Sequence, residues 1–144
     1  MSQANLAERA REHFASGLSC SESTLVTFLD AEGQDTSMVR LATSLCAGVG
    51  GNRDLCGILT AGQLVIGLER GRTAPSDICA KQRAFKLGGD FYKWFASRWG
   101  CRCDQIVTGE FRGPAETCRR ILAETVQHLQ TTLDDAGASQ CPSG

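Results

Sequence analysis

Residues 55–68 of this 144-residue chain read LCGILTAGQLVIGL, the longest apolar run in the sequence. A helix that begins near Cys56 would carry apolar side chains on nearly every face, so it must lie at the centre of a fold. Three glycines inside it would each cost about 1 kcal/mol relative to alanine. A close approach of neighbouring backbone would explain these three residues: Gly57, Gly62 and Gly67. With about fourteen residues, the run is short of the roughly 20 that span a bilayer.

The remaining sequence supplies helices that can surround this central one. Apolar residues at helical spacing predict helices over Asn5–Phe14, from Ser19 or Ser21 to Gly33, from a Thr36 cap to Leu45, from Ala84 to Trp99, and from Pro114 to Leu129, with a short turn from Cys103. No alternation typical of strands appears. The sequence therefore predicts an all-α fold, a compact single-domain bundle of five to six helices. Residues 1–133 form the predicted domain, and 134–144 a flexible C-terminal tail.

Charge and composition argue against several classes of function. The chain has 15 basic and 16 acidic residues, so it has no basic field for nucleic acid or an anionic membrane surface. Its first residues show no secretory signal, and we expect a cytoplasmic protein without a membrane span. His13 and His128 have no motif around them and are interpreted as solvated or capping residues, which argues against a Cys-His hydrolase. The turn Gly48–Asn52 lacks the ending of a phosphate-binding loop and is interpreted as a hinge.

The eight cysteines are more than a protein of a reducing compartment needs, which favours metal binding or redox chemistry. Four of them lie at or near a predicted helix start: Cys20, Cys56, Cys103 and Cys118. Unpaired amides and the helix dipole stabilise an anion there, so we expect lowered thiol pKa values at these positions. The intervals of 36, 47 and 15 residues contain no CxxC pair. Either the sulfurs converge in a reactive or metal-binding site, or they pack as small apolar residues in the core.

A resemblance to a known family adds to this interpretation. The order of motifs is similar to that of the C-GCAxxG-C-C family, whose members are described as redox-active; these motifs are GLSCSE at 17–22, GVGG at 48–51, Cys56-Gly57, LVIGL at 64–68, Cys103 and Cys118. The resemblance covers the chain from Cys20 to about Leu129. One element departs from the family pattern, with Ile58 in place of its alanine and Ala61 in place of its second glycine. Gly62 follows directly and can take over the packing role.

The resemblance implies redox or iron-sulfur work in a helical protein, an oxidoreductase or electron carrier without a hydrolase or transferase signature. Our first hypothesis is that Cys20, Cys56, Cys103 and Cys118 bind an iron-sulfur cluster for electron transfer or redox sensing. The alternatives are a metal-free dithiol relay and a zinc or copper(I) thiolate site. The sequence does not identify the redox partner protein. If the aromatic face of Phe91 to Trp99 were exposed instead of packed in the core, it would form a homodimer surface.

The other four cysteines are interpreted separately. Cys46 precedes the glycine turn, ten residues before Cys56, so it joins the site as a fifth ligand or resolving thiol, or it packs in the core. Cys101 either pairs with Cys103 or points away from it. Cys79 and Cys141 are interpreted as incidental.

Overall fold

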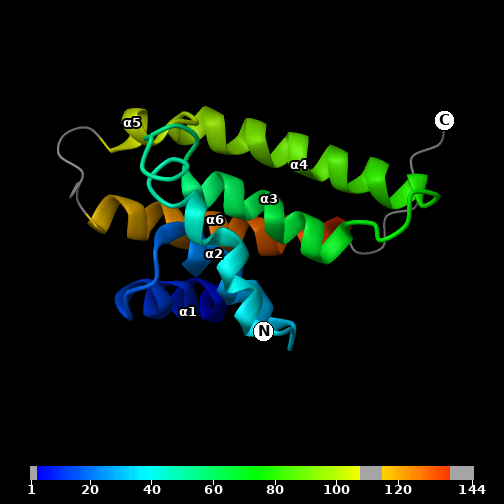
Figure 1. The fold of residues 1–144 in the computed structure, drawn as a ribbon, viewed down its shortest axis with the longest axis horizontal. Helices are drawn as coiled ribbons and strands as arrows, with labels where there is room; N and C mark the ends of the chain where they lie inside the picture. Colours follow the sequence, from blue (N-terminus) through cyan, green and yellow to red (C-terminus); the bar gives the residue numbers. More distant parts are fainter. Residues whose placement is uncertain (1–2, 108–114, 137–144) are drawn as a thin grey trace.

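The computed structural model describes residues 3–107 and 115–136 (Figure 1). Its helices are α1 (Gln3–Ala15), α2 (Cys20–Ala31), the 3-10 helix η1 (Thr36–Leu45), α3 (Gly57–Arg70), α4 (Ile78–Trp99), α5 (Cys103–Ile106) and α6 (Ala115–Ala136). The predicted all-α bundle is confirmed, and α5 is a single turn. Within the described ranges there are no strands, apart from one isolated bridge between Leu55 and Arg102. None of these helices combines the length and apolar character that crossing a membrane would require.

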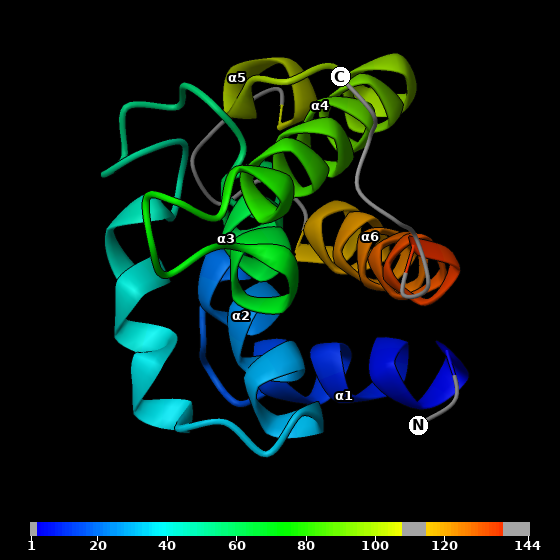
Figure 2. The ribbon, with the colours of Figure 1, turned by 90° about the vertical axis from the view of Figure 1, so that its right-hand side faces the viewer.

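Helix α3 lies at the centre, as its apolar sequence predicts. It packs against α2, η1, α4 and α6, and Figures 1 and 2 show it enclosed by the other helices. A Cβ at Gly62 would lie 2.5 Å from the Phe91 ring, and a Cβ at Gly57 would lie 3.2 Å from the Cys20 sulfur. The predicted approach of neighbouring backbone is confirmed at Gly57, where a Cβ would also lie 3.0 Å from the Leu45 carbonyl oxygen, whereas at Gly62 the neighbour is a side chain. Around Gly67, by contrast, the described residues leave the space within 4 Å of a Cβ empty.

Ser19 fixes the start of α2. Its hydroxyl oxygen accepts a hydrogen bond from the Glu22 amide, and the Glu22 carboxylate accepts one from the Ser19 amide at 3.0 Å. This reciprocal arrangement is a capping box, which satisfies amide groups that a helix start leaves unpaired. It sets Cys20 as the first residue of α2.

The segment from Thr36 to Leu45 is helical, but its form and its cap differ from the prediction. Asp35 rather than Thr36 provides the cap, because its carboxylate accepts the Ser37 amide at 2.9 Å. The segment is a 3-10 helix, in which side chains three residues apart share a face. This period aligns Val39, Ala42 and Leu45, all of which belong to or pack against the core.

A tight turn links η1 to α3. Five successive residues, 47–51, have positive φ values, including 55° at Ala47 and 67° at Val49. Gly48 is required in this turn, because a Cβ there would lie 2.4 Å from the Asp54 nitrogen. The Arg53 amide donates to the Ala47 carbonyl at 2.9 Å, which folds the turn back on itself. As a result, residues 53–56 lie beside the end of η1.

The aromatic face of α4 belongs to the core. Phe91 and Phe95 are fully buried, and Trp94 stacks on His128 of α6 with ring centroids 3.7 Å apart. The prediction that His128 is a solvated or capping residue is therefore wrong. Burial, together with the positive charge of Arg98, lowers the pKa of this imidazole and favours its neutral form.

Helix α6 continues to Ala136, past Leu133 at the end of the predicted domain. Pro114, the predicted start of this helix, lies outside the described residues, as do Cys141 and the rest of the predicted tail after Ala136.

Candidate thiol site

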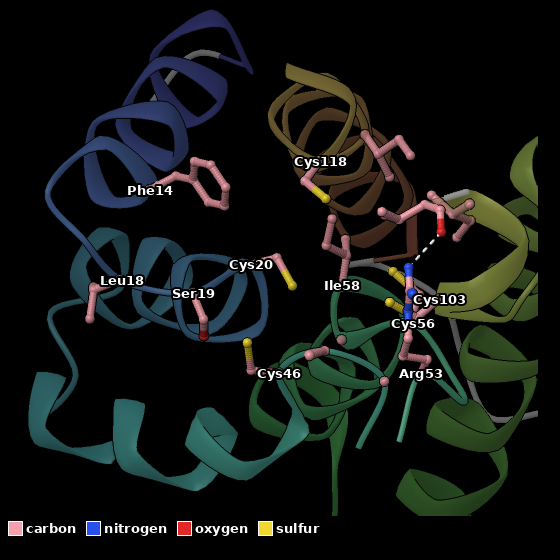
Figure 3. A pocket seen from close by; sticks show the side chains of 16 residues that line it. Phe14, Leu18, Ser19, Cys20, Cys46, Arg53, Cys56, Ile58, Cys103 and Cys118 are labelled. Atoms are coloured by element: carbon pink, nitrogen blue, oxygen red, sulfur yellow. Dashed lines mark hydrogen bonds between the residues drawn. The ribbon is translucent and has the colours of Figure 1, made fainter. Parts of the chain in front are cut away.

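A cavity of about 290 Å³ lies at the end of the bundle where α2, α3, α5 and α6 meet the glycine turn. Five cysteine side chains line it: Cys20, Cys46, Cys56, Cys103 and Cys118. The rest of its wall is mainly apolar, with Phe14, Ile58 and Ile121 among the lining residues. Figure 3 shows the five sulfurs around the same space, each carried by a different segment. All four cysteines predicted as site residues, and Cys46, thus face one cavity.

The first pair of thiols comes from α2 and η1. Cys20 begins α2, and Cys46 is the residue that follows η1. Ser21 holds the two elements together, because its buried hydroxyl donates to the Ala42 carbonyl at 2.8 Å. This packing places Cys46 beside Cys20 on the cavity wall, and Figure 3 shows the Cys46 sulfur directed toward the Cys20 side.

The second group of thiols is positioned by backbone pairing. The Cys56 amide donates to the Cys101 carbonyl at 2.8 Å, and the Cys103 amide donates to the Asp54 carbonyl at 2.6 Å. These bonds flank the bridge between Leu55 and Arg102 and bring Cys103 to the start of α3. Cys118, from the first turn of α6, completes the set.

The pKa values of Cys20 and Cys46 are shifted in opposite directions. A hydrogen bond from the Cys20 thiol lowers the pKa of Cys46 to about 6, and bonds from Ser19 and the Ala47 amide act in the same direction. The same contact with Cys46, together with burial, raises the pKa of Cys20 well above its usual value. These effects favour the charged form on Cys46 and the protonated form on Cys20.

The expected lowering of the pKa at helix starts is wrong for Cys20, Cys56 and Cys118. Burial raises the pKa of Cys56 to about 11, although the Ile58 and Leu59 amides at the start of α3 lower it. Burial also raises the pKa of Cys118, with a contribution from the charge of Cys103. The helix termini lie where the sequence predicts, but loss of hydration outweighs their stabilisation of a thiolate.

Two lining residues were not singled out from the sequence. Ser19 is predicted only as a helix cap. Its hydroxyl also donates a hydrogen bond to the Glu22 carboxylate at 2.9 Å, and its hydrogen bonding lowers the pKa of Cys46. Arg53 brings a positive charge to the cavity and donates to the Val107 carbonyl at 2.7 Å (Figure 3). The turn folds back so that the Asp54 amide donates to the Gly48 carbonyl, and no sequence pattern indicates this contact.

The other cysteines lie apart from the cavity or outside the described residues. Cys101 is not among the described lining residues, and its interaction with the Tyr92 side chain raises the Tyr92 pKa. Cys101 and Cys103 are both free thiols, so the structure contains no disulfide between them. Cys79, in the first turn of α4, is disulfide-bonded, so its interpretation as incidental is wrong.

The five thiols are candidate ligands of a metal centre. Several thiols on one cavity fit the chemistry of iron-sulfur, zinc or copper(I) sites. Across residues 3–107 and 115–136, however, no three Cys, His, Asp or Glu side chains are gathered closely enough to hold an ion. The chemistry of the donors therefore fits a metal, whereas their positions would have to contract around it.

Comparison with known proteins agrees with this arrangement. A family model described as "Putative redox-active protein (C_GCAxxG_C_C)" matches residues 18–132. Neither the curated proteins nor the solved structures contain a match to the chain. The family match spans most of the bundle, including all five cysteines that line the cavity. The chain therefore belongs to the C_GCAxxG_C_C family of cysteine-rich proteins, which is described as redox-active.

Proposed function

We propose that this protein is a thiol–disulfide redox protein in which Cys46 and Cys20 form the reacting dithiol. The observation that carries this proposal is that Cys20 and Cys46, brought together by the packing of α2 on η1, both line one cavity, where hydrogen bonding lowers the pKa of Cys46. Thiolates, rather than thiols, attack disulfides, and a neighbouring thiol is needed to complete the exchange. In this proposal Cys46 supplies the attacking thiolate and Cys20 supplies the neighbouring thiol.

The reaction follows from that arrangement. The Cys46 thiolate attacks one sulfur of a substrate disulfide, the S–S bond of the substrate breaks, and the leaving thiolate takes up a proton. The Cys20 thiol then loses its proton and attacks the Cys46 sulfur of the mixed disulfide, releasing the second substrate thiol. Two protein thiols become one disulfide, and the substrate disulfide is reduced by two electrons.

The remaining thiols give this dithiol a further option. Cys56, Cys103 and Cys118 line the same cavity and interact electrostatically with one another. One of them can attack the Cys20–Cys46 disulfide and pass oxidation deeper into the cavity. Cys118 is the candidate for this step, because it also senses the charge of Cys46.

A second candidate function is a thiolate-ligated metal centre, in the first instance an iron-sulfur cluster for electron transfer or sensing. It is favoured by the number of lining thiols and by their origin in separate segments. Cys20, Cys56, Cys103 and Cys118 would hold it, with Cys46 as an additional ligand. Such a centre would supply one-electron chemistry, and zinc or copper(I) would occupy the same donors without it.

Two measurements on the full chain separate these functions. Metal analysis and absorption spectra of anaerobically purified protein should show no stoichiometric metal, and mass spectrometry after mild oxidation should find a Cys20–Cys46 linkage. Cys20→Ser or Cys46→Ser should abolish that linkage, whereas the matched control Cys101→Ser should not change it. Stoichiometric iron with sulfide-to-iron charge-transfer bands would establish the cluster instead. Linkages scattered among all the cysteines would contradict the dithiol.

A further inference from the structure

Among the residues that the structure describes, helix α4 presents an apolar ridge that no other element covers. Ile78, Phe85 and Tyr92 follow one another at seven-residue intervals, and their exposed fractions are 53%, 79% and 44%. The opposite face of α4 contains the buried Phe91 and Phe95. Both views place α4 along the edge of the molecule (Figures 1 and 2). Single exposed apolar residues are ordinary, but an aligned series on one helix face is typical of a binding surface.

A groove of about 520 Å³ runs beside this ridge, between α3 and α4. Phe85 and Tyr92 form one side, and Gly67 and Gly89 contribute to its floor. A Cβ at either glycine would meet none of the described atoms within 4 Å. Glycine inside a helix costs about 1 kcal/mol relative to alanine, and packing within this chain does not account for these two. Close approach of a second molecule would.

The charge around the groove has one sign. Arg72 and Lys81 line it, and its described lining residues include no acidic side chain. Helix α4 carries five Lys or Arg residues and one Asp, although the whole chain has slightly more acidic than basic residues. Positive charge is therefore concentrated on the helix that carries the ridge.

We propose that this groove docks an acidic segment of a partner protein, which places an apolar side chain against Phe85 and carboxylates beside Arg72 and Lys81. The apolar ridge and the glycine floor supply the contact area, and the basic rim selects the sign of the partner's charge. A second copy of this chain fits less well, because two α4 helices would bring like charges together.

The groove also has a short connection to the thiol cavity. The Tyr92 side chain interacts with that of Cys101, which raises the Tyr92 pKa, and the Cys101 carbonyl accepts the Cys56 amide at 2.8 Å. A partner seated on Tyr92 thus lies one residue from the backbone that positions Cys56. Docking here does not depend on whether the cavity works through a dithiol or a metal.

A peptide titration followed by NMR tests the proposal on the full chain. The probe is a synthetic amphipathic helical peptide with leucines on one face and glutamates on the other, and the comparison peptide has lysines in place of the glutamates. We expect the glutamate peptide to shift the amide signals of Gly67, Gly89 and Tyr92. Its affinity should fall as salt is raised from about 50 mM to about 500 mM, because charges across the groove are screened.

Variants sharpen the test. Phe85→Ser and the double variant Arg72→Glu with Lys81→Glu should each weaken binding roughly tenfold or more. Gly89→Leu should block the groove without lowering the melting temperature, because its side chain enters open space. The control Arg120→Glu, an exposed charge reversal on α6, should leave affinity unchanged within about twofold.

Several results would overturn the proposal. Equal binding of the lysine peptide would show that the basic rim does not select the partner's charge. Signal shifts far from α4 would show that the peptide binds outside the groove. Self-association that Phe85→Ser abolishes would identify a second copy as the occupant. Binding to phosphatidylglycerol vesicles, with no response to the glutamate peptide, would identify a membrane surface instead.

Discussion

At the scale of single residues, the interaction between Cys20 and Cys46 gives two chemically identical side chains different pKa values. Cys20 is enclosed between α2 and the core, whereas Cys46 receives hydrogen bonds from Cys20, Ser19 and the Ala47 amide. Hydrogen bonds to a thiolate stabilise the charged form, and burial destabilises it. The two effects favour charge on Cys46, so this sulfur is the nucleophile of the pair.

The first prediction concerns the pH dependence of Cys46 alkylation by iodoacetamide. The rate should be half-maximal near the Cys46 pKa of about 6 and reach a plateau near neutral pH, because only the thiolate reacts. Peptide mapping by mass spectrometry at a series of pH values measures it. Cys20→Ala should move the midpoint upward, because the Cys46 thiolate loses its strongest hydrogen-bond donor. Cys101→Ala should leave the midpoint unchanged. A midpoint at the usual thiol value in the unaltered protein would contradict the assigned thiolate.

At the scale of elements, the start of α3 joins packing to the site. A Cβ at Gly57 would lie 3.0 Å from the Leu45 carbonyl oxygen, 3.1 Å from the Ser21 Cβ and 3.2 Å from the Cys20 sulfur. These atoms belong to packed backbone or to buried side chains, so they have little room to move. Gly57 therefore sets how closely α3 approaches the Cys20–Cys46 pair.

Replacement of Gly57 by alanine should destabilise the protein by about 1 to 3 kcal/mol, as expected for overpacking. It should also shift the midpoint of Cys46 alkylation, because the Cys20 sulfur must give way. Chemical denaturation measures the first effect and alkylation the second. The matched control is Gly67→Ala on the same helix, which enters open space and should stabilise the protein by up to about 1 kcal/mol. Equal stability of the two variants would show that the contact around Gly57 is loose.

The capping box of α2 makes its own prediction. Bonds from the Ser19 amide and hydroxyl and from Thr43 lower the Glu22 pKa. The carboxylate thus stabilises the fold fully above its unfolded-state pKa, and this contribution disappears as pH falls through the lowered folded-state value. Glu22→Gln should cost about 1 kcal/mol at neutral pH. Its urea unfolding curve should converge with that of the unaltered protein in acid; a difference that stays constant across pH would show that charge plays no part.

At the scale of the whole molecule, the sequence predicts the helices better than their meeting points. Local periodicity finds α3 because Ile58, Val65 and their neighbours are apolar on every side, and the capping signal at Ser19 finds the start of α2. The 3-10 form of η1 is not distinguishable, since Val39, Ala42 and Leu45 suit either helix type. Local signals therefore fix the boundaries of most elements.

The convergence of the thiols depends on contacts that no local pattern encodes. Cys56 meets Cys103 through the backbone bonds of Asp54 and Cys101, which side-chain identity does not reveal. Helix starts correctly located Cys20, Cys56 and Cys118 at amide-rich positions, but the pKa values follow burial, which is a property of the assembled bundle. Family resemblance named the residues, and only the fold separates Cys46 from the rest.

The last prediction joins the cavity to global stability. A Cys20–Cys46 disulfide would tie α2 to the end of η1 and close a loop of 26 residues in the unfolded chain. Loop-closure entropy then favours the oxidised protein by about 3 kcal/mol, which corresponds to a rise of roughly 10 °C in melting temperature. Calorimetry of oxidised and reduced protein, each treated with a chelator, measures the difference, and Cys46→Ser should remove it while Cys101→Ser retains it. A melting temperature that instead depends on added iron or zinc, and not on oxidant, would favour the metal centre, because a ligand bound only to the folded state stabilises it by mass action.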